Sequence, residues 1–488
     1  MKDFLEYSKR NYILLCLALG CLYITPLVIS NFYYIDDVSR SVGGYARWID
    51  NGRPLAQYLI LAMGFSNVID IAPLPLILSV IVLVTSGYYL CYSIGVEGKY
   101  PAVVIALAIL CSPFYIQNLS YRYDALTMGI SLSCALLAAS ISYRFNIKIG
   151  FPTATILVAI LLCFYQPSVN AFISVVCFLF ILKLNEKSAM NAIIYAAANV
   201  LSLIAGMLIY KLFVAEVFVN GGYSVEHSDI LPIALYSIPL INKNLDSFLV
   251  VFKSTLSGSF GRLFYFMFFI STALTMFTVA KSKGYSLALA GVSALLSLVA
   301  ILVMVFSIVG TMIFLKQPVF YPRVFIGFTG VMLLISYSST KIFKGFSSII
   351  PSIFFLAIFV QMFAYGNALS SQSEKEKFMF TAMADDIIKS RVKIESIRFN
   401  GTTSLAPTSY LSSKSFGIIT HIVPSYIRTD WMFGAFYFGR LGVDVTYDSK
   451  IDVNGELKKG CSKPHEKSSL YDSVVFENTM IFDFNRCK

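Results

Sequence analysis

The sequence predicts a mainly α-helical protein that crosses a membrane many times and ends in a small α/β domain. Hydrophobic residues fill 57% of its 488 positions and charged residues only 13%, far outside the usual composition of soluble proteins. Apolar runs of about 20 residues, long enough to cross a bilayer, recur as far as residue 366. From residue 367 onward these runs disappear, which predicts a separate polar domain.

Eleven segments are predicted to cross the membrane. The stretch 150–182 is too long for one ordinary helix, and Pro167 interrupts it, so we expect two short helices joined by a turn. The apolar run 12–30 is too long for a typical secretory signal and lacks a small-x-small cleavage site, which predicts a retained helix. The predicted spans are 11–30, 73–94, 101–117, 124–143, 150–164, 168–182, 189–212, 263–280, 286–312, 324–340 and 347–366.

Basic residues in the short connections predict the orientation, because cytoplasmic loops collect Lys and Arg. The N-terminal segment before the first span is basic, and so is every second connection, which places the N-terminus in the cytoplasm. An odd number of spans then puts the C-terminal domain outside. This also accounts for much of the net charge of +11, so no nucleic-acid partner is expected. The basic residues are Lys2, Lys9, Arg10, Lys99, Arg144, Lys148, Lys183, Lys187, Lys281, Lys283, Lys341 and Lys344.

The chain divides into a membrane domain, 1–366, with outer loops 31–72 and 213–262, and an outer domain, 367–488. The loop 213–262 contains apolar residues at helical spacing between 245 and 256, which predicts a helix lying along the membrane surface or, alternatively, a solvated loop helix.

The outer domain is predicted to contain a helix at 374–390 and strands at 392–399 and 474–484. Two of the nine cysteines, Cys461 and Cys487, stand in polar sequence there. In an oxidising compartment they are a natural disulfide, and two free thiols are the alternative. The other seven fall in apolar segments and are expected in the core.

Asp36 and Asp37, adjacent and directly after the first span, are the leading candidates for chemistry. A charged pair facing hydrocarbon costs a few kcal/mol, so these acids are expected to face water, a cation or a substrate. Arg40, Arg47 and Trp48 follow at spacings that can share one helical face, and Arg53 comes next. Outer arginines favour an anionic phosphate ligand. The alternative is that Arg40 only pairs with one of the two acids.

Three further polar groups fall on the predicted outer side. Aromatic-belt and snorkelling positions could explain any one of them, but all three share one side with the acids. They are Arg122 and Asp124 before the fourth span, Tyr165 and Gln166 in the turn before Pro167, and Lys316 and Arg323 in a loop with two prolines.

This combination favours glycosyl transfer from a lipid phosphate. A carboxylate can deprotonate a sugar hydroxyl, and nearby cations can stabilise a departing phosphate. The three histidines show no zinc-ligand spacing. The paired acids could hold Mg²⁺ or Mn²⁺ with the substrate phosphate, so a divalent cation stays open. No Walker A or dinucleotide motif is present, which disfavours a soluble nucleotide donor.

The pattern resembles the serotype-converting O-antigen glucosyltransferases encoded by phages and prophages of Gram-negative bacteria. The resemblance covers the whole chain, with motifs concentrated in the first third. The residues that carry it are Phe32, Tyr33, Tyr34, Ile35, Asp36, Asp37, Arg40, Gly44, Trp48, Gly52, Arg53, Pro54, Leu55, Tyr121, Arg122, Tyr123, Asp124, Tyr165, Gln166 and Pro167.

The resemblance implies a GT-C type glycosyltransferase in the bacterial inner membrane. The donor would be undecaprenyl-phosphate-linked glucose and the acceptor a lipid-linked O-antigen repeat in the periplasm, with a donor synthase and a donor flippase acting upstream. Asp36 or Asp37 would be the base, and the other acid would orient it or bind a metal. Asp124 would fill a second acidic position. Substrate contacts would come from Arg122 and Arg323 at the donor phosphate, with Arg40, Arg47, Trp48, Arg53, Tyr165, Gln166 and Lys316 as further candidates.

Two other functions remain open. A polysaccharide-precursor flippase would need ionisable residues along several span interiors, and these interiors are nearly free of them. An O-antigen polymerase or ligase would also use outer arginines, and only product analysis separates it from a glucosyltransferase.

Overall fold

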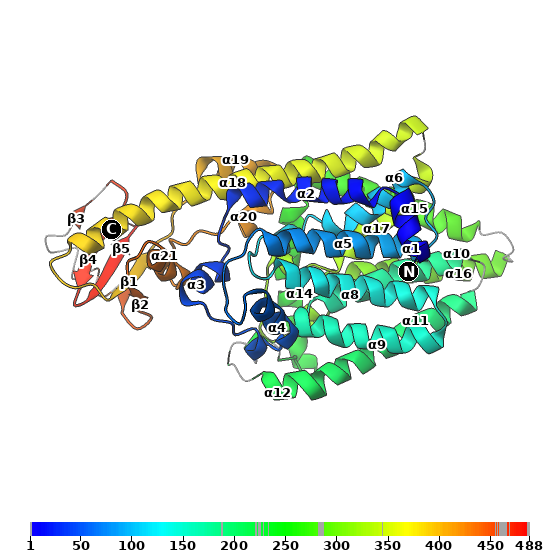
Figure 1. Ribbon diagram of the computed structural model, residues 1–488, viewed down its shortest axis with the longest axis horizontal. Helices are drawn as coiled ribbons and strands as arrows, with labels where there is room; N and C mark the ends of the chain where they lie inside the picture. The colour runs from blue at the N-terminus through cyan, green and yellow to red at the C-terminus, as the bar shows by residue number, and fades with distance from the viewer. Residues whose placement is uncertain are drawn as a thin grey trace.

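The computed structural model is mainly α-helical and consists of a bundle of long helices with a small sheet-containing domain at one end (Figure 1). The predicted fold class is therefore confirmed. The residues that the structure describes are 2–186, 189–219, 222, 226–227, 229–232, 234–281, 287–343, 345–453, 455, 457, 466–467 and 469–485. Cys461 and Cys487 lie outside them, so the disulfide stays a prediction.

Nine helices within the described residues have the length and apolar composition of a membrane span, so the protein is a multi-pass membrane protein. Their outer faces carry large apolar side chains such as Leu201 and Leu302, while small polar residues such as Ser202 and Ser297 point inward. Small residues between helices and apolar residues outside are expected where lipid is the solvent. The nine are α2 (Ile13–Ser30), α5 (Leu74–Ser93), α8 (Ala125–Arg144), α9 (Ile147–Phe164), α10 (Ser168–Asn185), α11 (Ala189–Tyr210) with its continuation through η2 (Lys211–Ala215) and α12 (Glu216–Phe218), α15 (Gly258–Ala280), α16 (Leu287–Phe306) and α18 (Ile349–Lys389).

Two predicted spans are helical over only part of their length. α6 (Lys99–Leu110) and α17 (Phe328–Ile342) have 12 and 15 residues, which corresponds to about 18 and 22 Å, short of the ~30 Å hydrocarbon core. α6 ends before Pro113, which cannot continue its hydrogen-bond ladder. Both helices are buried, and so is much of the irregular chain beside them. Irregular backbone at membrane depth is stable only where protein surrounds it, so these two short helices leave room for the site described below.

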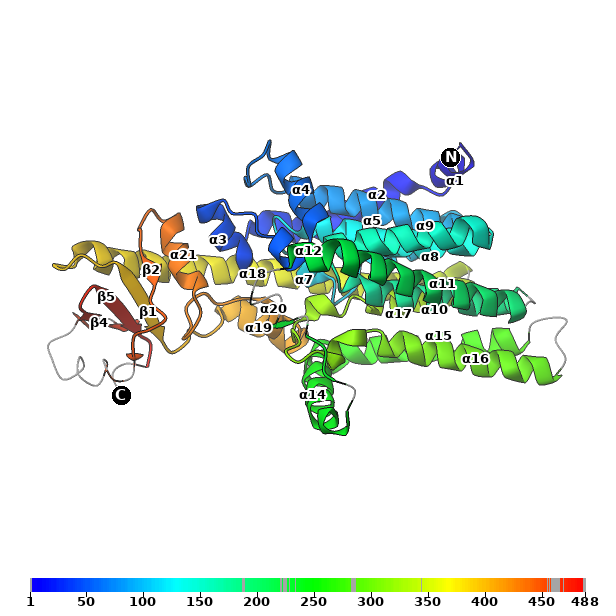
Figure 2. The same ribbon diagram turned by 90° about the horizontal axis from the view of Figure 1, so that it is seen from below.

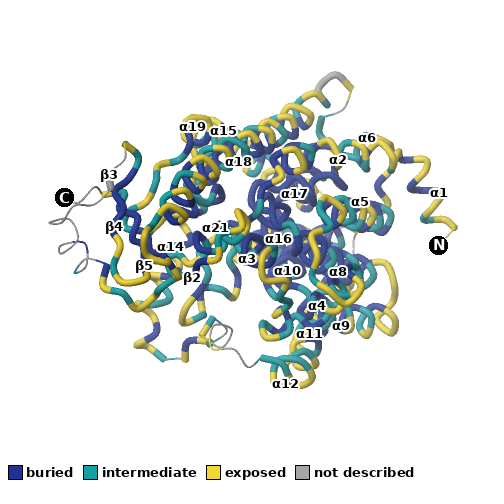
Figure 3. Tube along the Cα trace, turned by 60° about the vertical axis from the view of Figure 1, so that its left-hand side comes forward, coloured by how far each residue is buried: buried dark blue, intermediate teal, exposed yellow. Residues whose placement is uncertain are grey.

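The buried centre of the bundle is formed by α8, α10 and α17, as Figure 3 shows in dark blue. The N-terminal helix α1 (Lys2–Arg10) lies at one end of the bundle and the sheet at the other (Figure 1), as an odd number of crossings requires. Which end faces the cytoplasm stays a prediction.

Short elements gather at the end of the bundle that carries the sheet (Figure 1, Figure 2). α14 (Ile238–Thr255) runs across the direction of α15 and α16 (Figure 2) and exposes Leu249 and Val250, an arrangement that favours the predicted helix along the membrane surface. The short elements at this end are α3 (Asp36–Gly43), η1 (Ile49–Asn51), α4 (Pro54–Met63), α7 (Ile116–Leu119), η3 (Leu235–Ser237), α14 (Ile238–Thr255), η4 (Gly310–Phe314) and η5 (Pro322–Val324). η6 (Gly345–Ser348) precedes α18 at the opposite end.

The C-terminal region begins on α18, which has 41 residues and runs past residue 366 without a break. Its sheet has the order β2-β1-β5-β4-β3, with β1 parallel to β2 and β5, and β4 antiparallel to β5. The predicted strand at 474–484 is instead a hairpin, because the chain turns at Glu477, where φ is +50°. The elements are β1 (Ser396–Asn400), α19 (Pro407–Ser415), α20 (Ile419–Ile422), α21 (Phe433–Arg440), β2 (Thr446–Tyr447), β3 (Glu466–Lys467), β4 (Asp472–Phe476) and β5 (Thr479–Asp483).

Candidate active site

The two adjacent acids open helix α3, directly after a sharp change of chain direction. Ile35, the residue before Asp36, has φ of +49°, a conformation that costs energy for a β-branched side chain. A hydrogen bond to the C-terminal region helps to hold this turn, since the Ile35 N–H donates to the Tyr426 hydroxyl over 2.8 Å. The direction in which Asp36 and Asp37 project therefore depends on a residue 391 positions away.

Asp37 is fully buried and fixes two segments to each other. Its Oδ2 accepts hydrogen bonds from the main-chain N–H groups of Tyr34, at 3.0 Å, and Arg122, at 2.9 Å. Burial raises the pKa of Asp37 to about 8, although these two donors oppose the rise. At neutral pH the folded protein therefore holds Asp37 largely protonated.

Asp36 has a different environment. Its side chain is 39% exposed, and its nearest cation is Arg40, with Nη1 3.9 Å from Oδ2. Burial raises the pKa of the Tyr121 hydroxyl, Arg323 opposes the rise, and Asp36 adds to it, so Asp36 and Arg323 act on the same group. Asp36 is the acid of the pair that can reach a substrate.

Arg40 is buried between an acid and an aromatic ring. Its Nη1 lies 3.0 Å from Asp124 Oδ2, and its guanidinium lies 4.2 Å from the centre of the Trp48 ring. Trp48 Nε1 donates to the other oxygen of Asp124 over 2.5 Å. Asp124, Arg40 and Trp48 thus form a closed group, in which the main partner of Arg40 is Asp124 rather than either adjacent acid.

Arg47 is separated from this group. Helix α3 ends at Gly43, and Gly44 follows with φ of +57°, so Arg40, Arg47 and Trp48 do not share one helical face as their spacing predicted. Gly44 suits this position because it has no Cβ to clash. Arg47 is exposed, with its guanidinium 5.8 Å from the centre of the Tyr45 ring.

Arg53 and Gln166 meet at the turn between α9 and α10, which forms at Pro167 as predicted. Arg53 Nε donates to Gln166 Oε1 over 3.0 Å, and its guanidinium lies 5.0 Å from the Tyr165 ring. Gln166 Nε2 donates to the Asn51 carbonyl over 2.8 Å and to the Tyr210 hydroxyl over 3.0 Å. Arg53 makes no ion pair with a described acid, so its charge is available to a ligand.

Arg323 joins the group through Tyr165 and Tyr121. The Tyr165 hydroxyl donates to the Arg323 carbonyl over 3.1 Å, and Arg323 Nη1 donates to the Tyr121 hydroxyl. The Arg323 N–H donates to Gln117 Oε1 over 2.8 Å. The Tyr165 side chain thus lies between the guanidinium of Arg53 and the main chain of Arg323, whose guanidinium lies at Tyr121.

Two other predicted contacts have different partners. The guanidinium of Arg122 binds both oxygens of Asp70, at 2.7 and 3.3 Å, and also Asn31 Oδ1, at 2.6 Å. Lys316 is half exposed and pairs with Asp229 at 3.0 Å. Arg122 thus supplies its main-chain N–H to Asp37, and its side chain is occupied by protein groups.

Sequence reasoning missed Asp70, Gln117, Tyr210 and Tyr426. Asp70 could have been noticed as an acid between two isoleucines before the second span. Nothing in the local sequence marks Tyr426, because its partners lie almost the whole chain away.

The acids do not form a ready-made metal site. In the ranges that the structure describes, no three His, Cys, Asp or Glu side chains cluster in a way that could hold a metal ion. Both oxygens of Asp124 and one of Asp37 already accept hydrogen bonds. Of these acids, only Asp36 and the buried Oδ1 of Asp37 remain without a hydrogen bond, too few ligands for a divalent cation, so no step below uses one.

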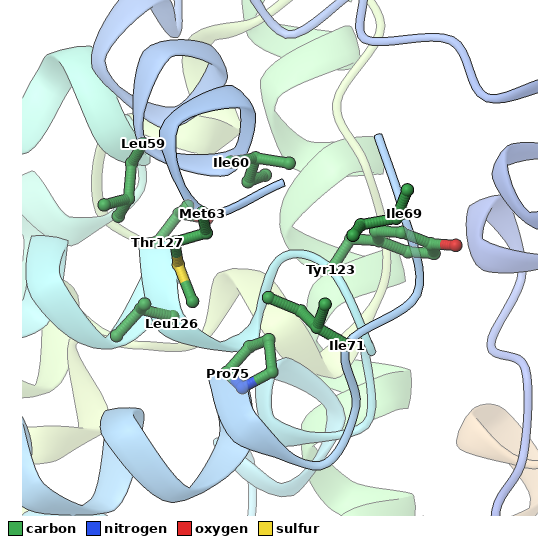
Figure 4. Close-up of a pocket in the computed structure, with 9 residues that line it drawn as sticks. All are labelled: Leu59, Ile60, Met63, Ile69, Ile71, Pro75, Tyr123, Leu126 and Thr127. Atoms are coloured by element: carbon green, nitrogen blue, oxygen red, sulfur yellow. The ribbon is translucent and has the colours of Figure 1, made fainter. Parts of the chain in front are cut away.

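A small apolar cavity lies between α4, the chain before α5 and the start of α8 (Figure 4). Leu59, Met63, Tyr123 and Thr127 are among its lining residues. Its volume of about 10 Å³ is close to the space of a single water molecule, so it is too small for a substrate.

Comparison with known proteins identifies the family. A Salmonella phage P22 protein, described as "Uncharacterized 55.3 kDa protein in gtrB 5'region", is 29% identical over 489 residues, which cover 98% of this chain and 99% of the relative. No solved structure matches the chain. The family model "Glucosyl transferase GtrII" matches residues 25–334, more than half of the chain, and includes Asp36, Asp124 and Arg323. The chain therefore belongs to the GtrII glucosyl transferase family, whose members are glycosyltransferases.

Proposed function

We propose that this protein transfers glucose from undecaprenyl-phosphate-linked glucose to a sugar hydroxyl of an O-antigen repeat, on the periplasmic side of the bacterial inner membrane. The observation that carries the proposal is a partly exposed carboxylate, Asp36, whose neighbour Asp37 is bonded to the turn that contains Tyr121, together with Arg323, bonded to Tyr121, and Arg53, beside Tyr165. Family membership supports glucosyl transfer. A base and two cations at one end of a membrane bundle support a phosphate donor carried by a lipid.

In the proposed reaction, the acceptor hydroxyl attacks C1 of the glucosyl group and gives its proton to Asp36. The bond between C1 and the phosphate oxygen breaks, and its electron pair leaves with the polyprenyl phosphate. Arg53 and Arg323 stabilise the charge that develops on that phosphate.

The other predicted acids receive positioning roles. Asp37 fastens the turn before α3 to the main chain at Arg122. Asp124 binds Arg40 and Trp48 and fixes α3 against the start of α8. Because both oxygens of Asp124 are occupied, we assign the proton transfer to Asp36 alone.

This donor requires two earlier steps in the cell. A synthase must attach glucose to the carrier lipid, and a flippase must bring the product to the outer leaflet. These two proteins are the proposed functional partners, together with whatever supplies the lipid-linked acceptor.

A reconstituted assay tests the proposal. Purified protein, polyprenyl-phosphate-linked glucose with a radiolabel in the sugar, and lipid-linked O-antigen repeat are expected to give labelled repeat, whose linkage is then determined. Transfer from a nucleotide sugar without the lipid donor would contradict the proposal. Passage of intact, unmodified lipid-linked oligosaccharide across liposomes would favour a flippase, and longer or relocated O-antigen would favour a polymerase or ligase.

A further inference from the structure

A second cleft lies outside the site described above, where the end of α2, the outer part of α18 and α21 meet. It has a volume of about 390 Å³, within the usual range for small-molecule sites. Tyr33, Lys377, Tyr426, Tyr437 and Arg440 are among its lining residues. Asp36, Arg53 and Arg323 do not line it, so it is not the place where the glucosyl group is transferred.

The walls of the cleft are aromatic and fixed. Tyr426 stacks on Trp431, with ring centres 5.5 Å apart and planes 8° from parallel. Tyr437 stacks on Phe380 at 4.2 Å. Tyr426 and Tyr437 are only 1% and 8% exposed, so these stacked rings form a rigid floor beneath the cleft.

The cleft is also cationic. Lys377 and Arg440 are exposed, and neither makes an ion pair with an acid in the described part of the chain. Arg440 lies 3.5 Å from the centre of the Tyr33 ring. No acid is among the described residues that line the cleft. Glu376 lies behind its wall, bonded to the Tyr426 N–H over 2.9 Å, and Asp70, which accepts from the Tyr33 hydroxyl over 2.7 Å, is paired with Arg122. Two cations without an acid favour an anionic group such as a diphosphate.

The distance of the cleft from the end of span α2 fits a ligand whose lipid tail lies in the membrane and whose polar part extends out of it. Gly366 of α18 packs against Pro26 of α2, and a helical rise of 1.5 Å places Lys377 about 16 Å farther along α18. α2 ends four residues after Pro26, or about 6 Å. Lys377 therefore lies about 10 Å beyond the end of α2, near the outer limit of the lipid headgroups.

We propose that this cleft binds the acceptor, a saccharide carried on a polyprenyl diphosphate. Lys377 and Arg440 bind the diphosphate, and the polar lining residues Asn31 and Ser373 lie beside the first sugars. This assignment rests on the proposed function and adds the place of its second substrate. Tyr33 is three residues from Asp36, at most about 11 Å of extended chain, so a sugar that continues from the cleft reaches the base.

Binding without the donor tests this assignment independently of catalysis. Calorimetric titration of the detergent-purified protein with diphosphate-linked O-antigen repeat is expected to show Kd at least tenfold higher for the double variant K377A/R440A. The charge-conserving double variant K377R/R440K and the control Lys389→Ala, an exposed lysine of the same helix paired with Asp385, are expected to bind as the native protein does. The free saccharide, without diphosphate, is expected to bind native protein and K377A/R440A equally.

The assignment would be overturned if K377A/R440A bound the acceptor as tightly as the native protein does. Thermal unfolding of the variant checks that it is folded. So would equal weakening for the free saccharide, or displacement of the ligand by phosphatidylglycerol, which would make the cleft a phospholipid site. If the native protein binds the acceptor through these cations but transfers no glucose, the proposed function fails and the acceptor cleft stands.

Discussion

Asp36 and Asp37 are neighbours in sequence, but their surroundings give them different chemistry. Asp37 is buried, accepts two main-chain hydrogen bonds and has a raised pKa, whereas the side chain of Asp36 is 39% exposed. Two carboxylates with separate environments can take separate roles in one site. The sequence could not separate the roles, because the main-chain donor that holds Asp37, the N–H of Arg122, lies 85 residues away along the chain.

The buried acid predicts a pH dependence of stability. An unfolded Asp loses its proton near pH 3.9, whereas folded Asp37 keeps it to about pH 8. Between these values the folded state binds more protons, so we expect this residue's contribution to the free energy of unfolding to fall as pH rises, then level off above pH 8. Asp37→Asn should flatten this part of the profile of thermal unfolding midpoint against pH. Asp50→Asn, at an exposed acid, is the control, and identical profiles for native and Asp37→Asn protein would contradict the assignment.

Replacing Arg53 is predicted to weaken the use of the lipid-linked sugar donor. Its side chain has a neutral partner, Gln166, and no described acid, and a hydrogen bond to a charged group contributes about 1.5–3 kcal/mol. We expect Arg53→Gln to lower kcat/KM for the lipid donor by about tenfold to a hundredfold, with acceptor affinity unchanged. Arg262→Gln, an exposed arginine near the start of α15, should behave as the native protein. A loss confined to acceptor binding would exclude the donor role.

At the scale of elements, helices with strong local signals were predicted correctly. Pro167 divides α9 from α10 as expected, and every predicted span contains a helix. The errors arose at element boundaries, which tertiary contacts help to set. α6 and α17 are shorter than predicted, and the irregular chain beside them is stable because neighbouring helices bury it. Glu477 turns the last predicted strand into the β4–β5 hairpin.

The turn before α3 depends on Tyr426. Its hydroxyl donates to the Tyr33 carbonyl over 2.5 Å and accepts from the Ile35 N–H. Loss of one partner leaves a buried group unsatisfied, at about 1–3 kcal/mol. We expect Tyr426→Phe to lower the thermal unfolding midpoint and to reduce kcat by about tenfold, because Asp36 is no longer held in position. Tyr410→Phe, at an exposed tyrosine, is the control, and full activity of Tyr426→Phe would show that the bridge does not position the base.

At the scale of the whole molecule, the C-terminal region contributes to both proposed sites, although most of the site motifs lie in the first third of the chain. Tyr426 bonds to the turn that carries Asp36, and Arg440 contacts Tyr33. Arg122 was predicted to bind phosphate but pairs with Asp70. Such partners come from segments far apart in sequence, so a single sequence without the fold does not reveal them.

The arrangement of the two chain ends predicts the topology. The N-terminus and the sheet lie at opposite ends of the bundle (Figure 1), and the basic loops place the N-terminus in the cytoplasm. We expect alkaline phosphatase fused to the C-terminus to be active in cells and a fluorescent protein fused to the N-terminus to fluoresce. An inactive C-terminal phosphatase in a stable fusion would reverse the proposed orientation.

The most direct measurement compares native protein with Asp36→Asn in the reconstituted transfer assay. Asparagine has nearly the size of aspartate, but it cannot accept the proton that the acceptor hydroxyl loses when it attacks C1. Because general-base catalysis contributes about 10²–10⁴-fold, we expect glucose transfer to fall by at least about a hundredfold, with thermal unfolding and acceptor binding unchanged. Transfer by Asp36→Asn near the native rate would contradict the central claim that Asp36 is the base.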